Sequence, residues 1–192
     1  LYNTKGELLK QLTKGEWVVL SVNGFDAKGE NLFYTSTQAH PVSSVSSSPL
    51  CVTNWKLNMK KGTSVCLNSK AVVGNGVHNA LVSKSGKYML DSYSSWSIPR
   101  AIDLVETKKG EVLENLLTAK NPYEGYDMPE VERGTIKAAD GVTDLNYFLV
   151  KPLNMDESKK YPTVVYVYGG PHTQLVTGGW MGGVSGWDIY MA

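Results

Sequence analysis

The chain has 192 residues with 19 basic and 18 acidic side chains, so its formal net charge is only +1. Charged residues make up 19% of the sequence and hydrophobic residues 42%, which excludes a collagen-like or highly charged disordered chain. The basic residues form no concentrated patch, so no nucleic-acid partner is expected, and no apolar run approaches the ~20 residues of a membrane-spanning helix.

An internal repeat dominates the first two thirds of the chain. A Lys-Gly pair followed by a strand-like stretch begins at Lys5, Lys61 and Lys109. A second pattern, centred on Gly29 and again on Gly86, alternates with the first. Two patterns that recur together indicate one structural unit repeated along the chain.

Each repeat contains four strand-like runs separated by glycine-containing turns. The expected strands are residues 17–22, 32–37, 51–59 and 63–67 in the first repeat, and 78–83, 87–95, 101–107 and 112–117 in the second. Four antiparallel strands in a unit of this size predict a blade of a β-propeller rather than a set of unrelated meanders. Residues 1–13 would then supply the end of a preceding blade.

The cysteines and two of the histidines are expected to have structural roles. A hairpin turn between Cys51 and Cys66 leaves them too far apart for the ~7 Å Cα separation of a disulfide, so both are predicted to be buried thiols. His40 lies in a serine-rich loop, residues 38–49, and is expected to be solvated. His78 begins a strand without a second His or Cys at metal-ligand spacing, so no metal site is predicted.

The strand pattern ends in an acidic stretch at residues 119–133. This stretch is rich in turn-forming and aromatic residues, which is typical of a boundary between domains. Its carboxylates are Glu124, Asp127, Glu130 and Glu132. A pair of them could serve acid–base catalysis, but an exposed linker surface is the favoured interpretation.

A hairpin and a buried strand are expected after this linker. Residues 135–139 and 145–151 form the hairpin, with Asp140-Gly141 as its turn. The β-branched and aromatic run at residues 163–168 predicts a strand covered on both faces. It ends at a glycine pair, and the carboxyl ends of such strands are where open α/β sheets build their sites.

A short helix is expected at the end of the chain. Ser185 followed three residues later by Asp188 has the form of a helix cap. Trp187, Tyr190 and Met191 then lie on one helical face.

This order of elements, with the motif Tyr168-Gly169-Gly170-Pro171, resembles the prolyl oligopeptidase family of serine peptidases. Within that family the sequence is most similar to the dipeptidyl peptidase IV branch in its Bacteroides-type form. Residues 14–19, 134–141 and 159–172 carry the resemblance, which extends over nearly the whole chain.

The resemblance implies a mainly β fold, with the C-terminal blades of a β-propeller followed by the first strands of a truncated α/β-hydrolase domain. Residues 1–118 would be the partial propeller, 119–133 the linker and 134–192 the N-terminal part of the catalytic domain. The family combines an eight-bladed propeller with the hydrolase domain and releases N-terminal dipeptides that have Pro or Ala in second position. The resemblance also implies a periplasmic or secreted bacterial protein without a cofactor, and it leaves a homodimeric parent open.

Tyr168 is the one catalytic and substrate-binding residue that the resemblance assigns to this chain, as the donor of a hydrogen bond to the oxyanion. A neutral phenol can stabilise developing negative charge from a fixed position. The structural alternative is that Tyr168 packs over the sheet edge. No nucleophile, base or acid is predicted, because residues 183–187 do not match Gly-x-Ser-x-Gly and the Ser, Asp and His of the triad follow the third hydrolase strand.

The sequence is therefore expected to be an internal fragment without peptidase activity of its own. The family's glutamate pair for the substrate amino terminus would lie in an earlier propeller segment. Two blades without the rest of their ring would expose apolar faces, so self-association or loose packing is predicted. The alternatives are a propeller-based protein-interaction module without catalysis, or a tripeptidyl or acylaminoacyl peptidase of the same family.

Overall fold

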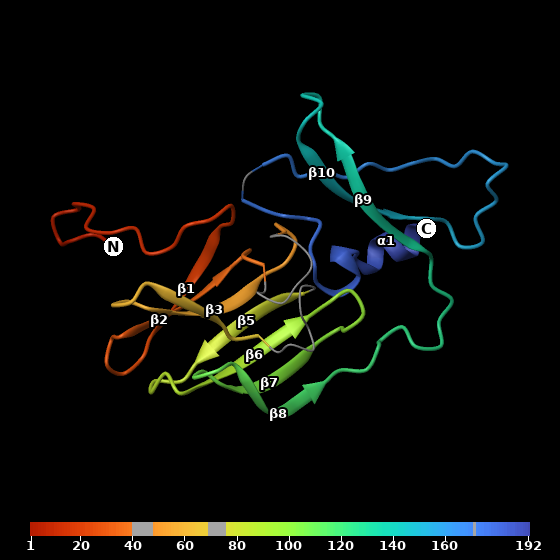
Figure 1. Cartoon of the computed structure of the whole chain (residues 1–192). Coiled ribbons are helices and arrows are strands. Elements are labelled where there is room, and N and C mark those ends of the chain that lie inside the picture. Colours follow the sequence, from red (N-terminus) through yellow and green to blue (C-terminus); the bar gives the residue numbers. More distant parts are fainter. Residues whose placement is uncertain (40–47, 69–75, 171) are drawn as a thin grey trace.

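Two four-stranded antiparallel sheets form the N-terminal part of the protein (Figure 1). The computed structural model describes residues 1–39, 48–68, 76–170 and 172–192, so His40 and most of its loop lie outside the described residues. The first sheet contains β1 (Val19–Phe25), β2 (Asn31–Ser36), β3 (Thr53–Asn58) and β4 (Thr63–Cys66). The second contains β5 (Val77–Val82), β6 (Tyr88–Ser94), β7 (Ala101–Glu106) and β8 (Glu111–Thr118). Both sheets have their strands in chain order, which confirms the predicted repeat.

The first expected strand is the one whose position the sequence predicts least well. The other strands of the two sheets lie within two residues of their expected bounds, whereas β1 runs from Val19 to Phe25. Trp17 lies outside the sheet, and its ring stacks on Tyr34 with 6.4 Å between the ring centroids. At the start of the chain, Tyr2 and Leu8 form an isolated antiparallel bridge instead of a strand of a sheet.

The two sheets share a hydrophobic core. Phe33 of β2 and Leu67, which directly follows β4, pack with Met89 and Val105 of the second sheet, and all four residues are at most 1% exposed. A second cluster lies within the first sheet and consists of Tyr34, Trp55, Leu57 and Cys66. Burial of these apolar side chains removes their surface from water, which stabilises the packing of the two sheets.

The turns of the two sheets come into close contact at Gly86. A Cβ atom on Gly86 would lie 2.5 Å from the Cβ of Asp26, which is closer than two carbon atoms can approach. Gly29 occupies the equivalent turn of the first sheet, and nothing lies within 4 Å of its Cβ position. Both glycines have φ near +67° (67° and 68°), so each turn needs glycine and one of them also needs the space.

The two cysteines are not joined by a disulfide, as predicted. The turn between them follows Asn58, and Cys66 lies opposite Trp55 in the β3–β4 ladder. Burial raises the pKa of the Cys66 thiol to about 12. The prediction that both thiols are buried is wrong for Cys51, which is only partly buried.

The predicted hairpin after the linker is formed by β9 (Val131–Lys137) and β10 (Asp144–Val150). In its turn, the Asp140 carboxylate accepts hydrogen bonds from the backbone N–H groups of Val142 and Thr143, at 2.9 Å each. β9 begins at Val131, earlier than expected and inside the stretch that the sequence assigns to the linker.

The strand expected at residues 163–168 is not formed in this structure. These residues have no strand assignment, and the exposed fractions of Val164, Val165, Tyr166 and Val167 lie between 71% and 80%. A strand buried on both faces needs neighbouring strands and covering helices. Within the described part of the chain, no strand of the sheets pairs with this run.

Helix α1 (Gly186–Met191) closes the chain and has the predicted cap. The Ser185 side chain accepts a hydrogen bond from the backbone N–H of Asp188, and the Asp188 carboxylate accepts one from the Ser185 backbone. The helix follows a short 3-10 helix, η2 (Trp180–Gly183). In Figure 1 the segment that follows residue 171 runs from the level of the hairpin towards the two sheets.

Candidate functional site

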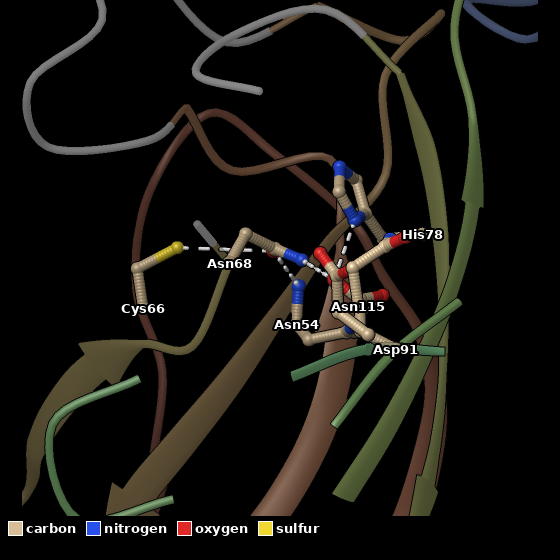
Figure 2. Close-up of polar contacts among 7 residues, drawn as sticks. Asn54, Cys66, Asn68, His78, Asp91 and Asn115 are labelled. Atoms are coloured by element: carbon tan, nitrogen blue, oxygen red, sulfur yellow. Dashed lines mark hydrogen bonds and ion pairs between the residues drawn. The ribbon is translucent and has the colours of Figure 1, made fainter. Parts of the chain in front are cut away.

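A buried polar network centred on Asp91 links the two sheets. Figure 2 shows Asn54, Asn68 and His78 pointing towards the Asp91 carboxylate. The carboxylate accepts hydrogen bonds from Nδ2 of Asn54 (3.0 Å), Nδ2 of Asn68 (2.8 Å) and Nδ1 of His78 (2.8 Å). The imidazole also stacks on the ring of Tyr93, with 4.9 Å between the centroids. Three donors from three different segments therefore satisfy one buried anion.

A second buried carboxylate lies beside the first. Asp103 on β7 is opposite Asp91 in the β6–β7 ladder and accepts a hydrogen bond from Nδ2 of Asn115 at 2.7 Å. Burial, together with these two carboxylates, raises the pKa of Tyr93. Asp91 and Asp103 are only 2% and 5% exposed, which leaves no room for a substrate to reach either of them.

The residues of this network suit a structural role. The His78–Asp91 contact has the geometry found in catalytic triads, but the other partners of Asp91 are the amides of Asn54 and Asn68, and His78 itself is only 4% exposed. No group of three or more His, Cys, Asp and Glu side chains that could hold a metal ion occurs among the described residues. His78 is thus placed within the sheet contact, in the structural position that the sequence analysis favours.

Tyr168, the predicted oxyanion donor, lies at the end of the extended run. Its side chain is 48% exposed, so the ring is not packed among the aliphatic residues of a core. Gly169 has φ +66°, and a Cβ atom on Gly170 would lie 2.9 Å from the Tyr168 ring. The two glycines thus give the backbone next to the accessible phenol a conformation and a closeness to the ring that residues with a side chain would not allow.

The segment after Tyr168 is anchored to the residues just before β3 of the first sheet. Nε2 of Gln174 donates a hydrogen bond to the carbonyl oxygen of Pro49 at 2.9 Å, and the backbone N–H of Gly178 donates to the carbonyl oxygen of Leu50 at 2.6 Å. Gly178 is buried, and a Cβ atom there would lie 3.0 Å from Sγ of Cys51. This anchoring was not predicted, because the sequence signal is only a scatter of glycines.

The Ser185 side chain takes part in a helix cap. Its hydroxyl donates to Oδ2 of Asp188 at 2.8 Å and caps helix α1. This agrees with the absence of the Gly-x-Ser-x-Gly pattern around it.

Two carboxylates of the predicted linker are engaged with the hairpin. Nζ of Lys151 lies 3.0 Å from Oε1 of Glu130 and 3.1 Å from Oε2 of Glu132. The Tyr147 hydroxyl donates to Oε1 of Glu132 at 2.9 Å, and this hydrogen bond and Lys151 hold the Glu132 pKa below its usual value. Both carboxylates are therefore engaged in contacts with residues of the hairpin and its end.

A groove of about 500 Å³ lies between the turns of the two sheets. Charges of both signs line it, including Asp26, Glu30, Lys56 and Glu106. Nζ of Lys56 donates to the backbone carbonyl of Thr107, and burial lowers the pKa of this lysine. Since Lys56 already bonds to the protein and charges of both signs line the groove, the groove favours no single class of ligand.

Comparison with known proteins agrees with the resemblance expected from the sequence. Residues 1–100 match the family model described as the dipeptidyl peptidase IV (DPP IV) N-terminal region. A crystal structure assigned to a dipeptidyl aminopeptidase IV from Bacteroides ovatus is 45% identical, with a TM-score of 0.83, and it covers 97% of this chain. Dipeptidyl peptidase 4 from Porphyromonas gingivalis is 27% identical, with a TM-score of 0.79 over 99% of this chain.

A fungal relative gives the same result from sequence alone. Dipeptidyl peptidase 4 from Trichophyton rubrum is 29% identical over 184 residues, which is 94% of this chain. The chain spans 22% of that relative and 25% of each of the two bacterial structures. No helix among the described residues is long and apolar enough to cross a membrane.

Proposed function

Because the chain belongs to the family described as the dipeptidyl peptidase IV N-terminal region, we propose that it is part of a serine peptidase that releases N-terminal dipeptides. The proposed substrates are peptides with Pro or Ala in second position. The observation that carries this proposal is that a fungal dipeptidyl peptidase 4 and two bacterial structures named for the same activity cover 94–99% of this chain.

In this proposal the two sheets are adjacent blades of a β-propeller, and residues 134–192 begin the α/β-hydrolase domain. The apolar surface of β1 supports the assignment of the two sheets to adjacent propeller blades. Leu20, Val22 and Phe25 are 53–61% exposed although they lie on a strand of a sheet. An exposed apolar sheet face of this kind fits a contact with a neighbouring blade.

The exposed run before Tyr168 supports the assignment of residues 134–192 to the start of the α/β-hydrolase domain. Val164–Val167 has the composition of a central strand and lacks partners among the described residues. Additional hydrolase strands on either side would cover both of its faces. Tyr168 would then stand at the carboxyl end of a central strand, where α/β-hydrolases place one oxyanion donor.

The catalytic step proposed for Tyr168 is electrostatic. Attack on the substrate carbonyl places negative charge on its oxygen, and the neutral phenol donates a hydrogen bond to that oxygen. The hydroxyl keeps its proton, so it acts by position rather than by acid–base transfer. The serine, aspartate and histidine of the triad are proposed to lie outside residues 1–192.

The experiment compares the full-length protein that carries this chain with the 192-residue chain alone. Each is incubated with peptides whose second residue is Pro, Ala or Leu, and the products are identified by mass spectrometry. We expect the full-length protein to release dipeptides from the Pro and Ala peptides and the 192-residue chain to release none. Release of tripeptides or acylated residues, or no cleavage by the full-length protein, would refute the proposal.

A further inference from the structure

Trp96 lies in the turn that follows β6 and contacts two distant parts of the C-terminal segment. The Arg133 guanidinium carbon of β9 lies over its ring, 4.6 Å from the centroid. Gly182 of η2 is also in contact with the ring, since a Cβ atom there would lie 2.5 Å from Cζ3 of Trp96. One indole therefore contacts the chain both before and after Tyr168.

The contact with Gly182 depends on the absence of a side chain. Gly182 is buried and has φ +73°, so this position favours glycine for its conformation as well as for its space. The backbone of the neighbouring Met181 also points its N–H at the Trp96 carbonyl oxygen, at 3.5 Å. The indole thus fits against bare backbone, and a smaller side chain at position 96 would leave a void.

Further contacts hold the C-terminal turn at residues 177–182 in place. Gly179 is buried next to β6, and a Cβ atom there would lie 3.0 Å from Oγ of Ser94. The backbone N–H of Thr177 donates to the carbonyl oxygen of Gly182 at 2.9 Å, which closes the turn on itself. The turn therefore lies against the second sheet and the residues just before β3, with Trp96 at one end of the contact.

The position of Tyr168 in the chain connects these contacts to the proposed chemistry. Tyr168 precedes Gln174, the first anchored residue, by six positions, which is a reach of at most ~20 Å even when fully extended. On the other side of Tyr168, Arg133 of β9 lies 35 residues earlier in the chain and contacts the same indole ring. Movement of the Trp96 ring would change both attachments together.

We propose that Trp96 is a positioning residue for Tyr168. Through Arg133 and Gly182 it fixes the segment that carries the phenol, so that the hydroxyl meets the oxyanion in the transition state. This inference rests on the proposed function, because it assigns Trp96 a role in that same site.

The test is made in the full-length protein with a chromogenic Gly-Pro substrate. We expect Trp96→Ala to lower kcat by about 10- to 100-fold with KM changed little, because a displaced oxyanion donor affects the transition state more than substrate binding. Trp96→Phe keeps an aromatic face and should stay within about threefold of the wild type. Arg133→Gln removes the other contact without changing the two four-stranded sheets and should also lower kcat.

The matched control is Ser97→Ala. It changes the exposed residue next to Trp96 in the turn after β6 and should leave kcat unchanged. Circular dichroism and the thermal midpoint establish that each variant is folded. If Ser97→Ala lowers kcat as much as Trp96→Ala, or if Trp96→Ala raises KM without lowering kcat, the inference is wrong.

A double-mutant cycle shows whether Trp96 acts through Tyr168. In a Tyr168→Phe background the hydroxyl is already absent, so adding Trp96→Ala should reduce kcat by less than about twofold. A further reduction equal to that seen with Tyr168 intact would overturn the positioning role.

A readout without activity separates this inference from the proposed function. In the 192-residue chain, Trp96→Ala should accelerate amide hydrogen exchange at Gly178 and Gly182 by at least about tenfold, while the core amides of β6 remain protected. Unchanged exchange rates at Gly178 and Gly182 would refute the role of Trp96 in holding the turn at residues 177–182. Absence of dipeptide release by the full-length wild type would instead refute the proposed function, and the exchange result would still stand.

Discussion

The buried carboxylate of Asp91 gives the sharpest test of how the two sheets are held together. Replacing Asp91 with Ala removes the acceptor for Asn54, Asn68 and His78 and leaves three buried donors without their partner. Each orphaned donor costs about 1–3 kcal/mol, so the loss of an acceptor shared by three donors costs at least about 3 kcal/mol. We therefore expect Asp91→Ala to lower the free energy of unfolding by about 3–5 kcal/mol.

The assay is urea unfolding of the 192-residue chain, followed by tryptophan fluorescence and circular dichroism. With a slope near 2 kcal/mol per molar urea, the expected loss lowers the midpoint by about 2 M. Asp140→Ala is the matched control, since Asp140 also accepts three hydrogen bonds but does so in an exposed turn. Water replaces the lost partners there, so its midpoint should fall much less.

The comparison between the two aspartates decides the interpretation. An Asp91→Ala midpoint equal to that of Asp140→Ala would show that burial adds nothing to the network. A large loss confined to one spectroscopic probe would show that the two sheets unfold separately, which would also contradict a shared core.

Three further predictions concern other parts of the chain. Gly86→Ala should destabilise the protein by about 1–3 kcal/mol more than Gly29→Ala, because both change a turn of positive φ but only the first creates an overlap; equal urea midpoints would contradict this. With a pKa of about 12, roughly one Cys66 thiol in 10,000 is ionised at pH 8, so iodoacetamide should label it about 1000-fold more slowly in the folded than in the urea-unfolded chain; equal rates would refute its burial. Folding lowers the pKa of Glu132, so its contacts stabilise the hairpin above pH 4.5 and are lost as the pH falls through the lower folded value; Tyr147→Phe should raise that pKa in an NMR titration, and an unchanged pKa would show that the phenol contributes nothing.

The repeat could be predicted from the sequence because its signals are local. Glycine turns at Gly29 and Gly86 and alternating apolar residues determine where each strand begins and ends. The cap at Ser185 is equally local, since both of its partners lie within three residues. These elements appear in the structure close to their expected positions.

The strand expected at residues 163–168 shows where local signals are insufficient. Its composition describes a strand in contact with partners on both sides, but burial is a property of those partners rather than of the run itself. Without them among the described residues, Val165 is 80% exposed.

The contacts between segments could not be predicted for the same reason. The network around Asp91 joins residues 54, 68, 78 and 91, which come from four different segments of the chain. Polar residues inside apolar strands were the available signal, but their spacing does not say which of them meet. Trp96 is similarly a single aromatic residue in a turn, and only the fold brings Arg133 and Gly182 to it.

The most direct measurement for the account as a whole is the kinetic effect of Tyr168→Phe in the full-length protein. If the phenol donates to the oxyanion, kcat for a Gly-Pro substrate should fall by about 100- to 1000-fold while KM changes little. A kcat within twofold of the wild type, in a variant that binds substrate normally, would show that Tyr168 takes no part in the reaction.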